Sequence, residues 1–219
     1  MEQHPPPMYT VHYFPIAGRA ELARMILEIA GYPIDWDAEK STTPFGQLPL
    51  LHFTDPATSQ PVTLAQSHAI GRFLAARHGL VPDGGPVKVA LADAVEESIR
   101  SMFEEMLGMF FSGHDEAGLK KAIDELKKDG LVRFIEAQTK LLKANGSNGF
   151  YFDSKLTYVE LSLYTVILVA NGVIGKGTIS TANAPELMRV YDMVKAQPRL
   201  VEYWQSERFH KKFFMSLDF

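Results

Sequence analysis

A change of pattern near residue 80 constrains the possible folds most. Before Gly79 strand-like and helix-like segments alternate, whereas after Val87 every periodic segment has the apolar spacing of a helix. The stretch between them, GLVPDGGPV, is rich in glycine and proline and interrupts both patterns. We therefore predict a disordered tail over residues 1–7, a small α/β domain over 8–80, a linker over 81–87 and an all-helical domain over 88–219.

The first domain should contain two α/β pieces in sequence. A strand is expected at about Tyr9–Phe14, followed after a four-residue turn by a helix over Arg19–Ala30. A strand pair then lies in LPLLHF and PVTL, joined by the polar TDPATSQ, and a closing helix follows AQS and stops at Gly79.

Five helices are predicted in the second half, roughly at Val89–Phe111, Glu116–Ala144, Tyr158–Val173, Ala184–Ala196 and Val201–Arg208. Thr157 and Glu160 form a capping box at the start of the third. The apolar stretch that follows is shorter than the roughly 20 residues of a membrane span, so it predicts a buried core helix.

Charge and cysteine content exclude several classes of function. The net charge of −4 and the pI near 6.0 argue against nucleic acid or an anionic membrane as the main partner. The chain has no cysteine, which removes disulfides, thiolate metal sites and cysteine nucleophiles, and favours an intracellular location. The seven histidines include no pair at metal-ligand spacing, so no metal site is expected.

Three short stretches could carry chemistry, although each has a simpler interpretation. Tyr13 lies at the carboxyl end of a strand, where α/β sheets place ligands, but a strand tyrosine is more often a packing residue. A cis bond at Leu48–Pro49 would turn the backbone of Leu48 toward a peptide-like ligand, yet an ordinary trans proline is commoner. Ser67 could serve as an N-cap, or with Gln66 could hold a carboxylate at the start of the helix.

The order of these stretches resembles the glutathione transferases. Tyr-Phe at the first strand, Gly-Arg-Ala-Glu into the first helix, Phe-Gly-Gln-Leu-Pro before the third strand and Gln-Ser before the next helix follow that family's pattern. The likeness is densest over Tyr9–Leu80 and is greatest to the sigma class, which includes glutathione-dependent prostaglandin D synthase. It implies a thioredoxin-like first domain.

The resemblance implies a role for each matching residue. Tyr13 would donate a hydrogen bond from its hydroxyl to the glutathione sulfur, as the catalytic residue. Glutathione would bind at Tyr13, Phe14, Arg19, Trp36, Lys40, Gln47, Leu48, Pro49 (cis in the family), Gln66, Ser67 and Ser101. The pocket for the hydrophobic second substrate would involve Phe14, Ala17, Phe103, Met106, Phe110 and Phe219. The stripe Phe103, Met106 and Phe110 is equally compatible with helical core.

Two departures from the family pattern stand out. Only YPID separates Gly31 from Trp36, so the second strand should be shortened or lost. The family usually has an aspartate at the position of Ser101, which reaches across a dimer to glutathione. Here the contact should be weaker, or supplied by Glu97, Glu104 or Glu105. The adjacent pair Glu96-Glu97 is otherwise expected to form a solvated helix face.

The resemblance predicts a cytoplasmic, homodimeric enzyme that adds glutathione, as co-substrate and without a metal, to small hydrophobic electrophiles. A prostaglandin D synthase-like isomerase and a non-catalytic crystallin or ligand-binding descendant are the alternatives. The presence of Tyr13, Gln66 and Ser67 argues against the non-catalytic alternative.

Overall fold

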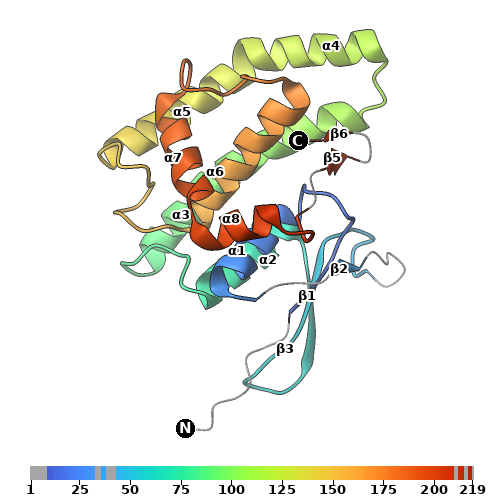
Figure 1. Cartoon of the computed structure of the whole chain (residues 1–219), viewed down its shortest axis with the longest axis vertical. Coiled ribbons are helices and arrows are strands. Elements are labelled where there is room, and N and C mark those ends of the chain that lie inside the picture. The colour runs from blue at the N-terminus through green and yellow to red at the C-terminus, as the bar shows by residue number, and fades with distance from the viewer. Residues whose placement is uncertain (1–8, 33–35, 38–42, 210–211, 215–216, 219) are drawn as a thin grey trace. The chain divides into compact units, whose positions relative to one another are not determined.

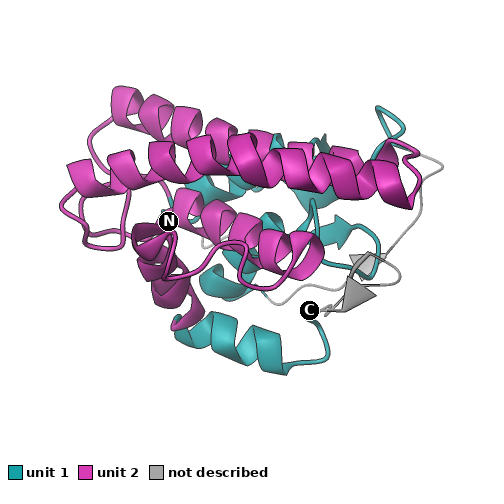
Figure 2. Ribbon diagram, turned by 90° about the horizontal axis from the view of Figure 1, so that it is seen from above, with its two compact units in different colours: residues 1–80, 197–218 teal, residues 81–196, 219 magenta. Residues whose placement is uncertain are grey.

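The computed structural model describes residues 9–32, 36–37, 43–209, 212–214 and 217–218. The chain divides into two compact units, coloured in Figure 2. Unit 1 comprises residues 1–80 and 197–218, and unit 2 comprises residues 81–196 together with residue 219.

Unit 1 is built on a four-stranded sheet in the order β2-β1-β3-β4 (Figure 1). β1 (Thr10–His12) runs parallel to β2 (Trp36–Asp37) and antiparallel to β3 (Leu50–Thr54), which pairs in turn with β4 (Pro61–Ala65). Val11 of β1 and Leu51 of β3, which are paired in the sheet, are both fully buried. The arrangement confirms the predicted α/β domain. Within the described residues β2 is two residues long, which agrees with the predicted shortening.

The helices of unit 1, within its described residues, are α1 (Glu21–Ala30), α2 (Ser67–Arg77) and α8 (Pro198–Gln205). α1 packs against both α2 and α8. The prediction assigned α8 to the second domain, but in the structure this helix groups with residues 1–80. The grouping has a polar basis, because the Tyr203 hydroxyl of α8 donates to the buried carboxylate of Glu21 at 3.2 Å.

Unit 2 consists of helical segments throughout its regular structure in the described part of the chain (Figure 1). They are α3 (Pro86–Phe111), α4 (Glu116–Glu125), the π-helical turn η1 (Leu126–Gly130), α5 (Leu131–Ala144), α6 (Tyr158–Val169), the π-helical turn η2 (Ala170–Ile174) and α7 (Pro185–Lys195). α6 packs against α3 and α7 and is buried on nearly every side. Among the described residues, no helix has the length and apolarity needed to cross a membrane.

The capping box at the start of α6 is confirmed. The Thr157 hydroxyl accepts the Val159 N–H at 3.3 Å, and the Glu160 carboxylate accepts the Thr157 N–H at 2.7 Å. The second strand pair, β5 (Lys212–Phe214) with β6 (Leu217–Asp218), corrects the expectation that residues 88–219 are all helical. Strands of three and two residues are too short to show a period-two pattern in the sequence.

Candidate functional site

The turn that connects β1 to α1 carries Tyr13 and Phe14 directly after the strand ends at His12. The turn is tight, because the Ile16 N–H donates to the Phe14 carbonyl at 2.7 Å. Gly18 has φ +114°, a conformation that other residues rarely adopt, and it redirects the chain into the helix. The turn thus brings the side chain of Tyr13 back beside its own backbone.

The Tyr13 hydroxyl has a defined position within this turn. It accepts a hydrogen bond from the backbone N–H of Arg19 at 3.2 Å, although only 6% of the Tyr13 side chain surface is exposed. The Phe14 ring meets the Tyr13 ring edge-on, with the centroids 5.5 Å apart. Tyr13 is therefore held by contacts at its ring and at its oxygen.

A second group of predicted residues meets where β4 ends and α2 begins. The Gln66 side-chain amide donates to the Gln47 amide oxygen at 3.1 Å, which brings together two predicted glutathione-binding residues that are 19 positions apart. Gln66 has φ +74°, and its side chain does not cap α2. Ser67 is the first residue of the helix, so the N-cap is Gln66 and not Ser67.

The peptide bond between Leu48 and Pro49 is cis, as the resemblance predicts. Leu48 and Pro49 are both buried directly before β3. Trp36 lies in β2, paired with Val11 of β1, but its side chain is outside the described part of the structure. Lys40 and Phe219 also lie outside the described residues.

The predicted site residues of unit 2 lie along α3. Phe103 and Met106 are buried, and Phe110 is partly exposed. Ser101 is exposed, and its hydroxyl donates to the Glu97 carbonyl of the preceding turn at 2.8 Å. The Ser101 hydrogen is thus already used within its own helix.

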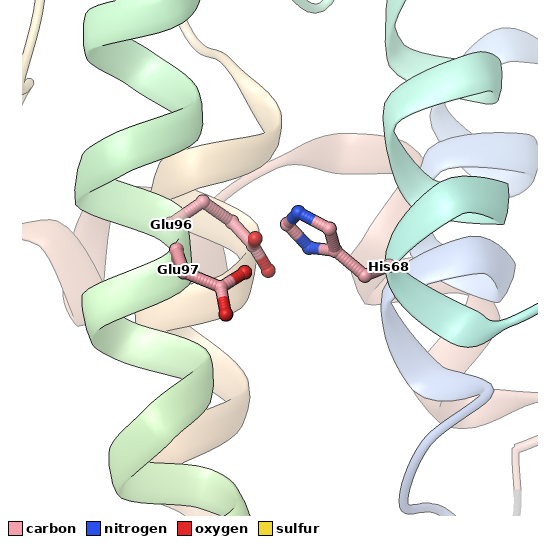
Figure 3. Close-up of side chains that lie close together, drawn as sticks. All are labelled: His68, Glu96 and Glu97. Carbon is pink, nitrogen blue, oxygen red and sulfur yellow. The ribbon is translucent and has the colours of Figure 1, made fainter.

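Glu96 corrects the expectation of a solvated helix face at Glu96-Glu97. Figure 3 shows both carboxylates at successive positions of α3, and His68 on α2 of unit 1. Glu96 is 2% exposed and accepts a hydrogen bond from the Ser162 hydroxyl of α6 at 3.1 Å. Glu97 is exposed and pairs with Arg100, as a surface position should.

The sequence interpretation missed Arg24, which is 1% exposed and contacts the same turn as Tyr13. Its guanidinium donates to the Ile16 carbonyl at 2.7 Å and to the Phe14 carbonyl at 3.2 Å. No signal in the sequence indicated this burial, because Arg24 is two positions from Leu22 and so lies on the opposite side of the helix from the apolar stripe that contains Leu22 and Met25.

Comparisons with known proteins identify the family of the chain. Residues 101–207 match the family described as glutathione S-transferase, C-terminal domain. Probable glutathione S-transferase 7 of Caenorhabditis elegans is 35% identical over 167 residues, which are 70% of this chain and 75% of that protein. Hematopoietic prostaglandin D synthase of Gallus gallus is 38% identical over 101 residues, which are 42% of this chain and 47% of that protein.

The fold itself has solved counterparts. A sigma class GST of Fasciola hepatica matches with a TM-score of 0.76 and 21% identity, over 93% of this chain and 99% of that one. The architecture is thus that of proteins in which a thioredoxin-like unit precedes a helical unit. The chain belongs to the glutathione S-transferase family, which confirms the resemblance found in its sequence.

Proposed function

We propose that this protein is a sigma-like glutathione transferase that activates the glutathione thiol through Tyr13 and adds it to small hydrophobic electrophiles. The observation that carries the proposal is the Tyr13 hydroxyl, fixed at the start of α1 by the Arg19 N–H at 3.2 Å. A hydroxyl has one hydrogen and two lone pairs, and the bond from Arg19 uses a lone pair. The hydrogen of Tyr13 is then the group that would be donated to a thiolate.

The required energies are within reach of this arrangement. A free thiol has a pKa near 8.5, and lowering it by about two units takes roughly 2.7 kcal/mol. A hydrogen bond to a charged acceptor contributes about 1.5–3 kcal/mol, and a helix N-terminus adds about 0.3–1 kcal/mol. One tyrosine hydroxyl beside the start of α1 is therefore sufficient, without a metal.

The rest of glutathione would be held by the remaining predicted residues. Gln66 and Ser67 at the start of α2 suit the γ-glutamyl carboxylate, because the first N–H groups of a helix attract anions. Leu48 and Gln47 precede β3 at a suitable place for the cysteinyl part. Trp36 and Lys40 would hold the glycyl end. Phe14 and Arg19 would flank the sulfur.

We further propose that the protein acts as a cytoplasmic homodimer. Light scattering should then give about twice the 24.5 kDa mass of the chain. A mass of one chain at working concentration would contradict this part of the proposal and leave the Tyr13 mechanism in place.

A second candidate function is a glutathione-dependent isomerase reaction that uses the same thiolate. The 38% identity to hematopoietic prostaglandin D synthase over 101 residues favours it. A conjugation assay with a chlorinated aromatic electrophile and an isomerisation assay with a prostaglandin endoperoxide, run side by side, distinguish the two.

The test of the mechanism is Tyr13→Phe, which removes the hydroxyl and little volume. The variant should fold and still be retained on immobilised glutathione. The pKa of the bound thiol, followed by ultraviolet absorbance of the thiolate, should rise by about one to two units. Turnover at neutral pH should fall about ten- to hundredfold and partly recover at alkaline pH. A wild-type thiol pKa near that of free glutathione would instead favour a non-catalytic protein.

A further inference from the structure

We propose that Arg24 is a positioning residue for the Tyr13 hydroxyl. It acts by fixing the turn of residues 14–18 through hydrogen bonds to backbone carbonyls of that turn. The inference rests on the proposed function, because it concerns the group that would activate glutathione. It assigns a task to a buried charge that the mechanism above does not use.

Hydrogen bonds from Arg24 go to the turn that follows Tyr13. The guanidinium is a planar fork of N–H donors, and in the protein interior each donor needs an acceptor. Nη1 donates to the Ile16 carbonyl at 2.7 Å, and Nη2 donates to the Phe14 carbonyl at 3.2 Å. One rigid group therefore fixes both ends of the Phe14–Ile16 segment.

The Phe14–Ile16 segment connects Tyr13 to the backbone donor that binds its hydroxyl. The chain continues from Ile16 through Gly18 to Arg19, whose N–H donates to the Tyr13 hydroxyl. A shift of the turn would move this donor, and it would also move Tyr13, which directly precedes Phe14. Because the hydrogen bond is 3.2 Å long, a displacement of a few tenths of an ångström would weaken it.

The charge of Arg24 also lies beside the Tyr13 ring. The Arg24 guanidinium carbon lies over the Tyr13 ring, 5.6 Å from the ring centroid, which is within the range of a cation–π contact. Arg24 thus contacts Tyr13 at the ring as well as holding the backbone that follows it. A residue that only filled space in α1 would need neither contact.

The partner of Arg24 determines how the proposal must be tested. Glu21 is 1% exposed and accepts from Arg24 Nη1 at 3.3 Å. Burial raises the pKa of the Glu21 carboxyl, and the nearby charge of Arg24 opposes that rise. Removing Arg24 alone would leave a buried carboxylate without its counter-ion, and such a variant is expected to unfold.

Two variants avoid that problem. Arg24→Met combined with Glu21→Gln removes both charges at once and keeps similar volumes. Arg24→Lys keeps the charge beside Glu21 but replaces the fork with a single ammonium group, which cannot hold two carbonyls in the same geometry. Glu21→Gln alone is the matched control for the double variant, because it leaves the bonds from Arg24 to the turn in place. Since it also removes the buried counter-ion of Arg24, it is compared only where circular dichroism shows that it is folded, and Arg24→Lys does not depend on it.

The readout is the pKa of bound glutathione, measured by ultraviolet titration together with the pH profile of kcat/KM. The double variant should raise the thiol pKa by about one unit and lower kcat/KM at neutral pH about tenfold, with recovery at alkaline pH. Arg24→Lys should give a smaller rise, and Glu21→Gln should give the wild-type value. The affinity for glutathione should change little, because Gln66 and Ser67 are untouched.

The outcomes separate this inference from the proposed function. If the folded double variant, or Arg24→Lys where the double variant does not fold, keeps the wild-type thiol pKa while Tyr13→Phe raises it, the role of Arg24 is overturned and the proposed function stands. If Tyr13→Phe also leaves the thiol pKa unchanged, the proposed function fails, and this inference fails with it.

Discussion

Gly18 lies so close to Tyr13 that a Cβ atom placed on it would be 3.0 Å from the Tyr13 hydroxyl oxygen. The turn can hold the hydroxyl there because residue 18 has no side chain. Gly18→Ala should therefore have two effects, one on the backbone at φ +114° and one on the hydroxyl. We expect a loss of about 1–3 kcal/mol of stability and a fall of at least about tenfold in kcat/KM.

Gly79→Ala is the matched control for this prediction. Gly79 also has a positive φ, +72°, but a Cβ there would meet nothing within 4 Å. Thermal unfolding should show a loss of stability for both variants, whereas conjugation assays should show a loss of activity for Gly18→Ala alone. Normal kcat/KM in folded Gly18→Ala would mean that the position of the hydroxyl is not critical.

Gln66 allows the backbone and the side chain to be tested separately. Its φ of +74° suits glycine, and its amide bonds Gln47. Gln66→Ala and Gln66→Gly should both weaken glutathione binding about five- to thirtyfold, since each removes the amide. Gln66→Gly should be the more stable of the two by about 0.5–1 kcal/mol, because it relieves the backbone.

Ser101→Ala provides the comparison in unit 2. Its hydroxyl is bonded to the Glu97 carbonyl, so its loss should change glutathione affinity less than Gln66→Ala does. Calorimetric titration with glutathione measures all three variants. A larger effect at Ser101 would reverse our assignment of the carboxylate-binding residues.

The histidine pair on the sheet should make stability depend on pH. The rings of His12 and His52 are 4.4 Å apart, and His52 Nδ1 lies 2.9 Å from the Thr63 hydroxyl. Burial, and secondarily the charge of His12, lower the pKa of His52. Because the folded state then binds this proton more weakly than the unfolded state, the contribution is complete at high pH and is lost as pH falls below about 6.5.

Thermal melts of the wild type and of His52→Gln between about pH 8 and pH 5 test this dependence. The fall of Tm with decreasing pH should be shallower in His52→Gln. His12→Gln should flatten it less, since the charge of His12 is the smaller cause of the shift. Parallel curves for the three proteins would show that the pair does not contribute.

Thr157→Ala should cost about 1–2 kcal/mol of unfolding free energy, as expected for loss of an N-cap. Thr157 is fully buried and starts α6, the most buried helix of unit 2. Asp115→Ala removes a comparable cap, the one that accepts the Gly118 N–H at 2.8 Å, from α4, which has no buried residue. Urea unfolding should show a smaller loss for Asp115→Ala, and equal losses would argue against the special role of the α6 cap.

The elements with strong local signals could be predicted from the sequence. The capping box of Thr157 and Glu160 predicted the start of α6, and the change of period after Phe14 predicted α1. Both signals can be read from the sequence because capping and periodicity act within a few residues. The π-helical turns η1 and η2 could not be predicted, because no capping residue or change of period marks them in the sequence. Each adds a residue to a turn inside a pattern that otherwise predicts one continuous helix.

The site was predictable only where the family pattern supplied the residues. Gln47 and Gln66 could be named, although nothing between them in the sequence indicates that their amides meet. Arg24 and Glu21 could not, because a charged pair three positions apart on a helix normally predicts an exposed surface. The Glu21 carboxylate is bonded by the hydroxyl of Tyr203, which is 182 positions away, and no local sequence pattern indicates such a contact.

The bond between Tyr203 and Glu21 also has a consequence for biosynthesis. The first 80 residues are synthesised well before α8, because residues 81–196 are made in between. Until Tyr203 emerges, the carboxylate of Glu21 lacks its hydroxyl donor, and Glu28 lacks Arg208, which binds it through two hydrogen bonds of 3.0 and 3.1 Å. The first unit therefore lacks these hydrogen bonds through most of translation. It gains them only when α8 and the residues directly after it have been made.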